Sequence, residues 1–182
     1  DVRRIDRLIT DISAASRLDA ELSRARLRPV DVGRLVEGLV EAQTAVGPLV
    51  NDVRIKTERS GGRPALVTAD ADRLAQVVVN LIDNAASFSP VGGTIRILVG
   101  HRDPYVEIRV EDEGPGVPEE AREAIFERFY SERPRYEDYG KHSGLGLSIA
   151  RAIVEALDGR IHVEDREDGA TGAIFVVSLP AL

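Results

Sequence analysis

The sequence predicts an α+β fold: a two-layer sandwich in which a mixed β-sheet carries about three helices on one face, preceded by one amphipathic helix. Short segments with alternating or β-branched apolar residues indicate about five or six strands. Three longer segments carry apolar residues at helical spacing. Because strands and helices do not alternate strictly along the chain, a mixed sheet is favoured over a doubly wound parallel one.

The N-terminal segment, residues 1 to about 24, is predicted to be the amphipathic helix. Its apolar side chains form a heptad-like stripe made of Ile5, Leu8, Ile12, Ala15 and Leu22. Such a stripe packs on a partner helix or, alternatively, on the helix's own domain. The chain contains no methionine and opens inside this helical pattern, so we expect it to be part of a longer protein.

The next elements are two helices and two strands. Pro29 closes the N-terminal segment, and Asp31 can cap a helix that continues to about Val46. "VRIKTE" and "ALVTAD" are predicted strands on either side of the turn "SGGRP". A helix then extends from about Asp72 to Ala86, where "SFSPVGG" ends it.

The second half of the chain supplies the remaining strands. "GTIRILVG" and "YVEIRVED" form a hairpin joined by "HRDP", and a short helix is predicted from Pro118 toward Phe126. Residues 130 to 143 are polar and lack periodicity, and a loop of this length in a compact domain is usually functional or mobile. "GLGLSIARAIVEALDG" is a helix ending at Gly159, and "RIHVED" and "GAIFVVSLP" are the last strands.

Composition excludes several classes of function. There is no cysteine, so disulfides, thiolate metal sites and cysteine nucleophiles are excluded. The formal charge is -7, and the charged residues are spread along the chain, so we expect no nucleic-acid partner. No apolar run approaches the ~20 residues of a membrane span, so we expect no membrane contact by this part of the protein.

Three amides follow the flank of the helix over residues 72–86. Gln76, Asn80 and Asn84 lie one turn apart beside the apolar stripe. Asn costs up to ~0.7 kcal/mol against Ala in a helix, and a half-buried unpaired amide costs ~1 to 3 kcal/mol more. Either nearby loop backbone pairs with these amides, or their oxygens face a hard cation and its phosphates, since magnesium takes oxygen ligands.

The turn "EDEGPGVPE" is a candidate binding loop. It places Asp112 at a strand end, followed by Gly114 and Gly116, where backbone can approach a ligand closely. A carboxylate there can accept a hydrogen bond from an exocyclic amine, and the alternative is an ordinary acidic turn.

A second glycine-rich turn, "GKHSGLGLSIA", opens a helix. Gly140, Gly144 and Gly146 bring free backbone N–H groups to the positive helix end, which makes a phosphate site. The turn is not a Walker A loop, and it is not the dinucleotide fingerprint, because the position of the third glycine is Ile149.

In their order along the chain, these motifs resemble those of sensor histidine kinases. The amide helix, "DEGPG", "IFERFY" and "SGLGLSIARAIVE" are similar to the N, G1, F and G2 boxes of that family's ATP-binding domain, which has the Bergerat or GHKL-type fold. "RRIDRLITDISAASRLDAEL" resembles the second helix of the family's dimerisation and phosphotransfer hairpin. The resemblance covers roughly residues 28 to 180 and implies two domains: the truncated hairpin over 1–27 and the ATP-binding catalytic domain over 28–182.

The resemblance implies ATP and magnesium as cofactors. It implies that the ATP-binding residues are Asn80, Asn84, Phe88, Asp112, Gly114, Gly116, Val117, Gly144, Leu145 and Gly146. Asn84 would be the magnesium ligand, and the catalytic residues would be Asn80, which positions magnesium and the γ-phosphate, and Lys141. Lys141 lies in the loop that would act as a lid, where it either reaches a phosphate or is merely solvated.

The remaining roles follow by the same likeness. Asp112 would receive the adenine amino group, Phe88 would lie against the ring, and Val117 would add apolar wall. Backbone from 144–146 would contact the phosphates. Two aromatic residues, Phe126 and Phe129, are expected to anchor the lid in the core. Ser87 stands where the family often has a basic residue near the phosphates.

The implied reaction is transfer of the γ-phosphoryl of Mg-ATP to a histidine outside this chain, for relay to an aspartate of a response regulator. None of His101, His142 and His162 has the setting of the family's acceptor, so no autophosphorylation is expected. The implied partners are the acceptor hairpin of the same or the partner subunit and a receiver domain, in a protein that is a homodimer at full length. We expect the cytoplasmic domain of a membrane-bound sensor.

Three other functions remain as alternatives. Hydrolytic GHKL ATPases carry a glutamate general base where this chain has Asn80, and an amide cannot take a proton. A serine kinase of the same fold is disfavoured by the preceding heptad helix. A non-enzymatic dimerisation module with a decayed pocket is disfavoured because Asn84, Asp112 and both glycine pairs are present together.

Overall fold

The computed structural model describes residues 25–128, 130 and 145–182, together with seven N-terminal residues: Ile5, Ile9, Ile12, Ser13, Ser16, Arg17 and Ala20. These seven are helical, as the sequence predicts, and all are exposed. Leu8, Ala15 and Leu22 of the predicted stripe lie outside the described residues. Ile9, which the heptad pattern passed over, is 57% exposed, as is Ile12. No helix in the described part is both long and apolar enough to cross a membrane.

A five-stranded mixed sheet forms one layer of the domain, with the strand order β2-β4-β5-β7-β6. Its strands are β2 Arg54–Ser60, β4 Thr94–Arg102, β5 Tyr105–Glu111, β6 Arg160–Asp165 and β7 Ala173–Pro180. β2 runs parallel to β4, and the other neighbours are antiparallel. The predicted hairpin of β4 and β5 is confirmed, with Arg102 opposite Tyr105 next to the turn.

A separate two-stranded ribbon joins β1 (Arg28–Asp31) to β3 (Leu66–Ala69). Pro29 was expected to close the N-terminal segment, with no strand around it, and that expectation was wrong. Proline is tolerated here because a two-stranded ribbon consists only of edges, where a missing N–H removes no bond of a central ladder. β2 and β3 flank the predicted turn but do not pair with each other, because β2 joins β4 and β3 joins β1.

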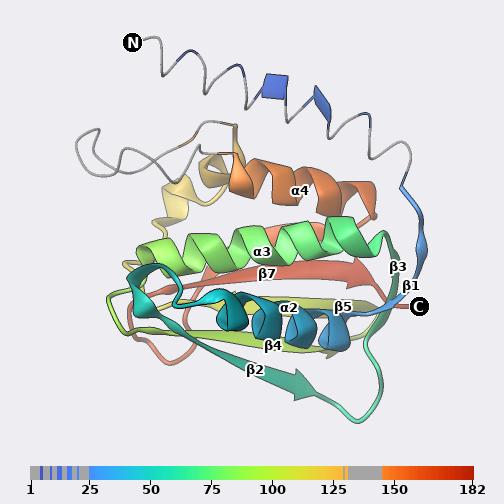
Figure 1. Cartoon of the computed structure of the whole chain (residues 1–182), viewed down its shortest axis with the longest axis horizontal. Helices are drawn as coiled ribbons and strands as arrows, with labels where there is room; N and C mark the ends of the chain where they lie inside the picture. The colour runs from blue at the N-terminus through green and yellow to red at the C-terminus, as the bar shows by residue number, and fades with distance from the viewer. Residues whose placement is uncertain are drawn as a thin grey trace.

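Three helices cover one face of the sheet, as predicted (Figure 1). They are α2 Val32–Val46, α3 Ala71–Phe88 and α4 Gly146–Ala156. The carboxylate of Asp31 caps α2 by accepting from the backbone N–H of Arg34 at 3.1 Å. Asp70 caps α3 in the same way, accepting from the N–H groups of Asp72 and Arg73 at 3.0 and 3.3 Å.

The core lies between α3 and the sheet. The six residues of the predicted apolar stripe of α3 are fully buried: Leu74, Val77, Val78, Leu81, Ile82 and Ala85. Each large aliphatic side chain buried in this way stabilises the fold by about 1.5–3 kcal/mol. The stripe therefore fixes the rotation of α3 and turns its amide flank toward α4, which packs beside it.

Two predicted helices differ in detail from the structure. The segment after Pro118 is not an α-helix but two short 3₁₀ turns, Glu119–Ala121 and Ala124–Phe126. α4 ends at Ala156 rather than at Gly159. A Cβ at Gly159 would lie 2.6 Å from the backbone oxygen of Ser178, so glycine is required where the chain passes from α4 close to β7.

Candidate nucleotide-binding site

The amide flank of α3 is half-buried, and its three amides have different surroundings. Nδ2 of Asn80 donates to the backbone oxygen of Gly146 at 3.0 Å, and Oε1 of Gln76 accepts from Nη1 of Arg73 at 3.1 Å. Backbone pairing, one of the two explanations for the stripe, is therefore correct for the Nδ2 group of Asn80. The amide of Asn84 makes no hydrogen bond within residues 25–128, 130 and 145–182.

The C-terminal end of α3 is held by Asn51, a residue that no sequence motif singled out. Asn51 has a left-handed backbone with φ of 58°, and its Nδ2 donates to the carbonyl oxygens of Ala86 and Ser89 at 3.0 and 3.1 Å. Ala86 lies in the last turn of α3 and Ser89 is its C-cap residue, so neither carbonyl has a partner within the helix. Asn51 thus fixes the turn of helix that carries Asn84 and Phe88. The signal in the sequence was the Asn in "LVND", a residue type that tolerates the left-handed region.

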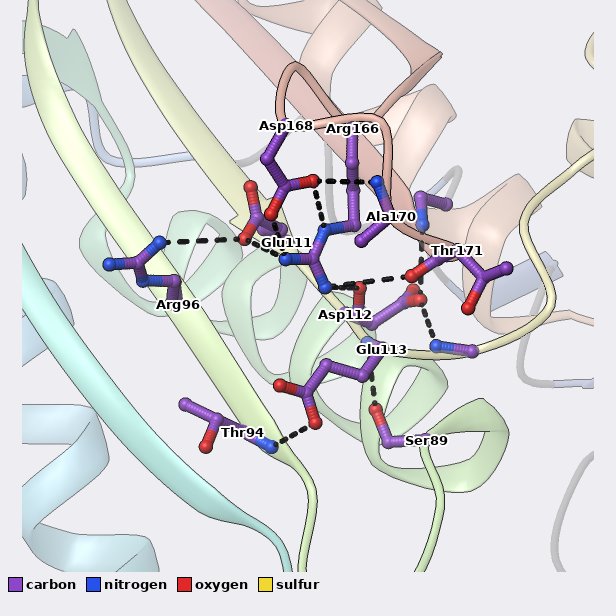
Figure 2. Close-up of polar contacts among 12 residues, drawn as sticks. Ser89, Thr94, Arg96, Glu111, Asp112, Glu113, Arg166, Asp168, Ala170 and Thr171 are labelled. Atoms are coloured by element: carbon purple, nitrogen blue, oxygen red, sulfur yellow. Dashed lines mark hydrogen bonds and ion pairs between the residues drawn. The ribbon is translucent and has the colours of Figure 1, made fainter.

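Asp112 follows β5 and is only 3% exposed, so its carboxylate is buried (Figure 2). Its Oδ1 accepts two backbone hydrogen bonds, from Gly114 at 2.9 Å and from Ala173 at 3.1 Å. No hydrogen bond reaches Oδ2 within the described part of the chain. Burial raises the pKa of Asp112, while the two N–H donors and the charge of Arg166 oppose this shift. The fixed Oδ1 leaves Oδ2 as an acceptor for a ligand amine.

The glycines after Asp112 are required by close contacts. A Cβ at Gly114 would lie 2.9 Å from the backbone oxygen of Phe88 and 3.1 Å from its Cβ. Gly116 has φ of 80°, and its Cβ would lie 3.0 Å from the backbone oxygen of Gly172. The structure therefore brings Asp112 and Gly114 against the end of α3. Phe88 is 36% exposed there, and Val117 packs partly buried against the core.

The N-terminus of α4 is the candidate phosphate site. Leu145 is buried, and Gly146 begins α4. The position that a Cβ of Gly146 would occupy is open space, so this residue places no side chain beside the first backbone N–H groups of the helix. Asn80 ties this end of α4 to α3 through Gly146. Gly144 and Lys141, which the resemblance also places here, lie outside the described residues.

Phe126 of the aromatic box lies in the core, as the sequence predicts. Phe126 is 4% exposed and packs edge-on against Phe175, with ring centroids 6.2 Å apart. The guanidinium of Arg151 on α4 lies 5.9 Å from the Phe126 ring centroid. Phe126 therefore links the 3₁₀ turns to the core and to α4. Phe129 is outside the described residues.

The two described histidines have partners away from these residues. Nε2 of His101 lies 3.1 Å from the backbone oxygen of Pro64, and Nε2 of His162 lies 2.7 Å from Oε1 of Glu164. Both contacts fit the structural or exposed roles expected from the sequence. His142 is not among the described residues.

The matching family model is that of histidine kinase-, DNA gyrase B-, and HSP90-like ATPases, over residues 69–182. The chain belongs to this ATPase family. Within the family, its sequence and structural relatives are sensor histidine kinases and their catalytic domains. The chain is 45% identical over 190 residues to the sensor protein ChvG of Agrobacterium fabrum, a match that covers 100% of this chain and 32% of that protein. The chain thus spans about a third of the length of the curated sensor proteins it matches.

Solved structures support the same assignment and the α+β fold. ShkA, solved at full length in complex with AMPPNP, matches with a TM-score of 0.76 and 28% identity, covering 96% of this chain and 35% of that one. The histidine kinase ThkA, solved in complex with the response regulator protein TrrA, matches with a TM-score of 0.71 and 26% identity. That match covers 100% of this chain and 49% of ThkA. Membership of an ATPase family assigns ATP as the nucleotide of this domain.

Proposed function

We propose that this domain binds Mg-ATP between α3, the loop after β5 and the start of α4, and transfers the γ-phosphoryl group to a histidine outside the chain. The observation that carries the proposal is Asp112, a buried carboxylate whose Oδ1 is occupied by backbone N–H groups. Within the described chain no hydrogen bond reaches its Oδ2, and a carboxylate oxygen can accept a hydrogen bond from a ligand N–H group. Its Oδ2 would accept the adenine amino group.

The adenine pocket is built around this carboxylate. Phe88 would lie against the adenine ring, and the backbone at Gly114 and Gly116 would approach the ring. Both positions require glycine, because a Cβ at either would meet neighbouring backbone. Val117 would supply apolar wall. The partly exposed Phe88 supports this assignment, because an aromatic ring at a pocket mouth gains contact when a planar base covers it.

The phosphate end would be built by α3 and α4. Asn84 would hold magnesium: its amide oxygen is of the ligand type that this ion prefers, and within the described chain it has no competing hydrogen bond. Bound magnesium would neutralise phosphate charge. Asn80 would orient the metal and γ-phosphate, and its bond to Gly146 couples this role to the N–H groups of Leu145 and Gly146.

Two further residues of the phosphate end are proposed from the resemblance alone. Gly144 would add another backbone N–H group to the phosphates, and Lys141 would bring a positive charge. Phosphoryl transfer depends mainly on positioning and on charge stabilisation, so these groups need no covalent role.

The proposed partners follow from the proteins that this chain resembles. ThkA was solved with a response regulator, which supports a receiver domain as the acceptor of the relayed phosphoryl group. Residues 1–27 would be the second helix of a phosphotransfer hairpin, and the exposed Ile5, Ile9 and Ile12 would pack in a homodimer of the longer protein. The domain would act on the cytoplasmic side of a membrane-bound sensor.

Calorimetric titration of the purified chain with ATP, with and without magnesium, tests the nucleotide site. We expect magnesium-dependent binding that Asn84→Ala abolishes and Asp112→Ala weakens. Gln76→Ala is the matched control, because this amide lies on the same flank but pairs with Arg73. Absence of ATP binding by the parent chain would refute the proposal and favour the dimerisation module.

Incubation with γ-labelled ATP tests the phosphotransfer part. The chain alone should acquire no label on histidine, whereas an added acceptor hairpin from the longer protein should become labelled. Turnover of ATP without any acceptor, lost in Asn84→Ala, would instead support the hydrolytic alternative.

A further inference from the structure

The turn between β6 and β7, residues 166–172, packs against the loop that carries Asp112 (Figure 2). Arg166 begins the turn, and its side chain is only 11% exposed. Its guanidinium binds the carboxylate of Asp168 through both Nε and Nη2, and Oδ1 of Asp168 in turn accepts from the N–H of Ala170 at 3.0 Å. The two side chains therefore close the turn on itself.

The same guanidinium reaches the end of β5. Nη1 of Arg166 lies 3.5 Å from the backbone oxygens of both Asp112 and Thr171, and Nη2 lies 3.5 Å from Oε1 of Glu111. Asp168 binds the Nε–Nη2 edge of the group, so Nη2 faces the carboxylates of both Asp168 and Glu111. One half-buried cation thus bridges the turn to the two residues at which β5 runs into the adenine loop.

Beyond Arg166, the backbone of the β6–β7 turn meets the backbone at Asp112 with no side chain between them. Gly172 has φ of 140°, and a Cβ there would lie 2.1 Å from the backbone oxygen of Asp112. The next residue, Ala173, exchanges backbone hydrogen bonds with Asp112: its oxygen accepts from the Asp112 N–H at 3.0 Å, and its N–H donates to Oδ1 at 3.1 Å. The position of the turn therefore determines where the carboxylate of Asp112 points.

The charge of Arg166 acts on the same group. Burial raises the pKa of Asp112, and the guanidinium opposes that rise because it favours the carboxylate form. Without this cation the acceptor would be both less firmly placed and less readily ionised.

We propose that Arg166 is a positioning residue for base recognition: by closing the β6–β7 turn onto Asp112, it sets the nucleotide site's preference for a base with a 6-amino group. This inference rests on the proposed nucleotide site. Nothing in the sequence motifs points to Arg166, which lies more than fifty residues beyond Asp112, in the acidic turn "DREDGATG". Its proximity to Asp112 comes only from the pairing of β5 with β7.

The test compares two ligands, ATP and purine riboside triphosphate, which lacks only the 6-amino group. Calorimetry with magnesium is carried out on the parent chain and on Arg166→Gln. The dissociation constant for ATP should rise about fivefold to tenfold, because the hydrogen bond to the displaced carboxylate is weakened but not removed. The constant for purine riboside triphosphate should change by less than about twofold, because this ligand has no 6-amino group to donate to Asp112.

Two further variants separate positioning from general damage. Arg96→Gln is the matched control: this arginine also faces Glu111, at 3.8 Å, but its side chain is 56% exposed and ATP binding should be unchanged. In an Asp112→Asn background, Arg166→Gln should weaken ATP binding no further, because the group it positions has been removed.

Equal losses for both ligands, or no loss for either, would overturn the inference. If circular dichroism shows that Arg166→Gln is unfolded, Asp168→Asn opens the same contact from the solvent side, since Asp168 is 52% exposed, and it must show the same base-selective loss. A parent chain that binds neither ligand refutes the nucleotide site itself. A parent that binds ATP and responds to Asp112→Asn, with Arg166→Gln unchanged, refutes only the role of Arg166.

Discussion

Replacement of Asp112 by asparagine changes one oxygen to an NH₂ group and leaves the size of the side chain unchanged. The structure determines which way the new amide turns: the N–H groups of Gly114 and Ala173, at 2.9 and 3.1 Å, require an oxygen at the Oδ1 position. The NH₂ group must therefore take the position of Oδ2, where it faces the base. A donor then meets the 6-amino donor of adenine, and an acceptor for ATP is lost.

The expected size of the effect follows from the lost bond. A hydrogen bond to a charged group contributes about 1.5–3 kcal/mol, so the dissociation constant for ATP should rise about 10- to 150-fold. Affinity for GTP should rise relative to ATP, because the new NH₂ group can donate to the 6-oxo group of guanine.

Competition calorimetry with ATP, GTP and purine riboside triphosphate measures this change in preference. Thermal unfolding of Asp112→Asn provides the control for folding, since both backbone bonds to Oδ1 are retained. Unchanged ATP affinity in a folded variant would refute the reasoning. So would equal weakening for ATP and for the analogue without the amino group, because Asp112 would then not contact the 6-amino group.

Three further predictions concern pH and stability. Burial raises the pKa of Asp112 above the ordinary value of about 3.9, so acidification protonates this acceptor before it protonates ordinary aspartates. The ratio of ATP affinity to purine riboside triphosphate affinity should therefore fall as the pH drops through the raised pKa. Asp112→Asn should remove that pH dependence. Asp70→Ala removes the cap of α3 and should lower the free energy of unfolding in urea by about 1 kcal/mol, whereas an equal loss in Asp72→Ala, which caps nothing, would contradict the capping role. Gly159→Ala should lower the free energy of unfolding by about 1–3 kcal/mol, because its Cβ would lie 2.6 Å from the backbone oxygen of Ser178. Gly38 in α2 has open space where a Cβ would be, so Gly38→Ala should raise the free energy of unfolding by about 0.5–1 kcal/mol. Urea unfolding of both variants measures the two changes.

Local chemistry explains the elements that were predictable. The apolar stripe of α3 has a period that only a helix can bury on one side, so Leu74 and Ala85 could be assigned to the core and Asn80 and Asn84 to the flank. The Asp31 cap and the β4–β5 hairpin depend on neighbours within a few residues. These predictions are confirmed, because the interactions that decide them are contained in short stretches of sequence.

Elements that depend on distant partners were not predictable in the same way. Proline disfavours helix, so Pro29 was expected to end the N-terminal segment. The strand around it forms because β3 lies alongside and pairs with it. "VRIKTE" and "ALVTAD" have strand patterns, but pattern alone does not choose a partner, and the two strands enter different sheets.

By itself, therefore, the sequence determined the α+β class and the buried face of α3. It also indicated the candidate groups of a nucleotide site: an amide helix, a carboxylate at a strand end and a glycine-rich helix start. Tertiary structure alone decided that Nδ2 of Asn80 binds Gly146, that Asn51 holds the end of α3, and that Arg166 reaches the Asp112 loop. The physical reason is the separation along the sequence over which each kind of interaction acts. Periodicity, capping and turn chemistry act over one or two turns of chain, whereas these contacts join residues 35 to 66 positions apart and exist only after the sheet has paired and the helices have packed on it.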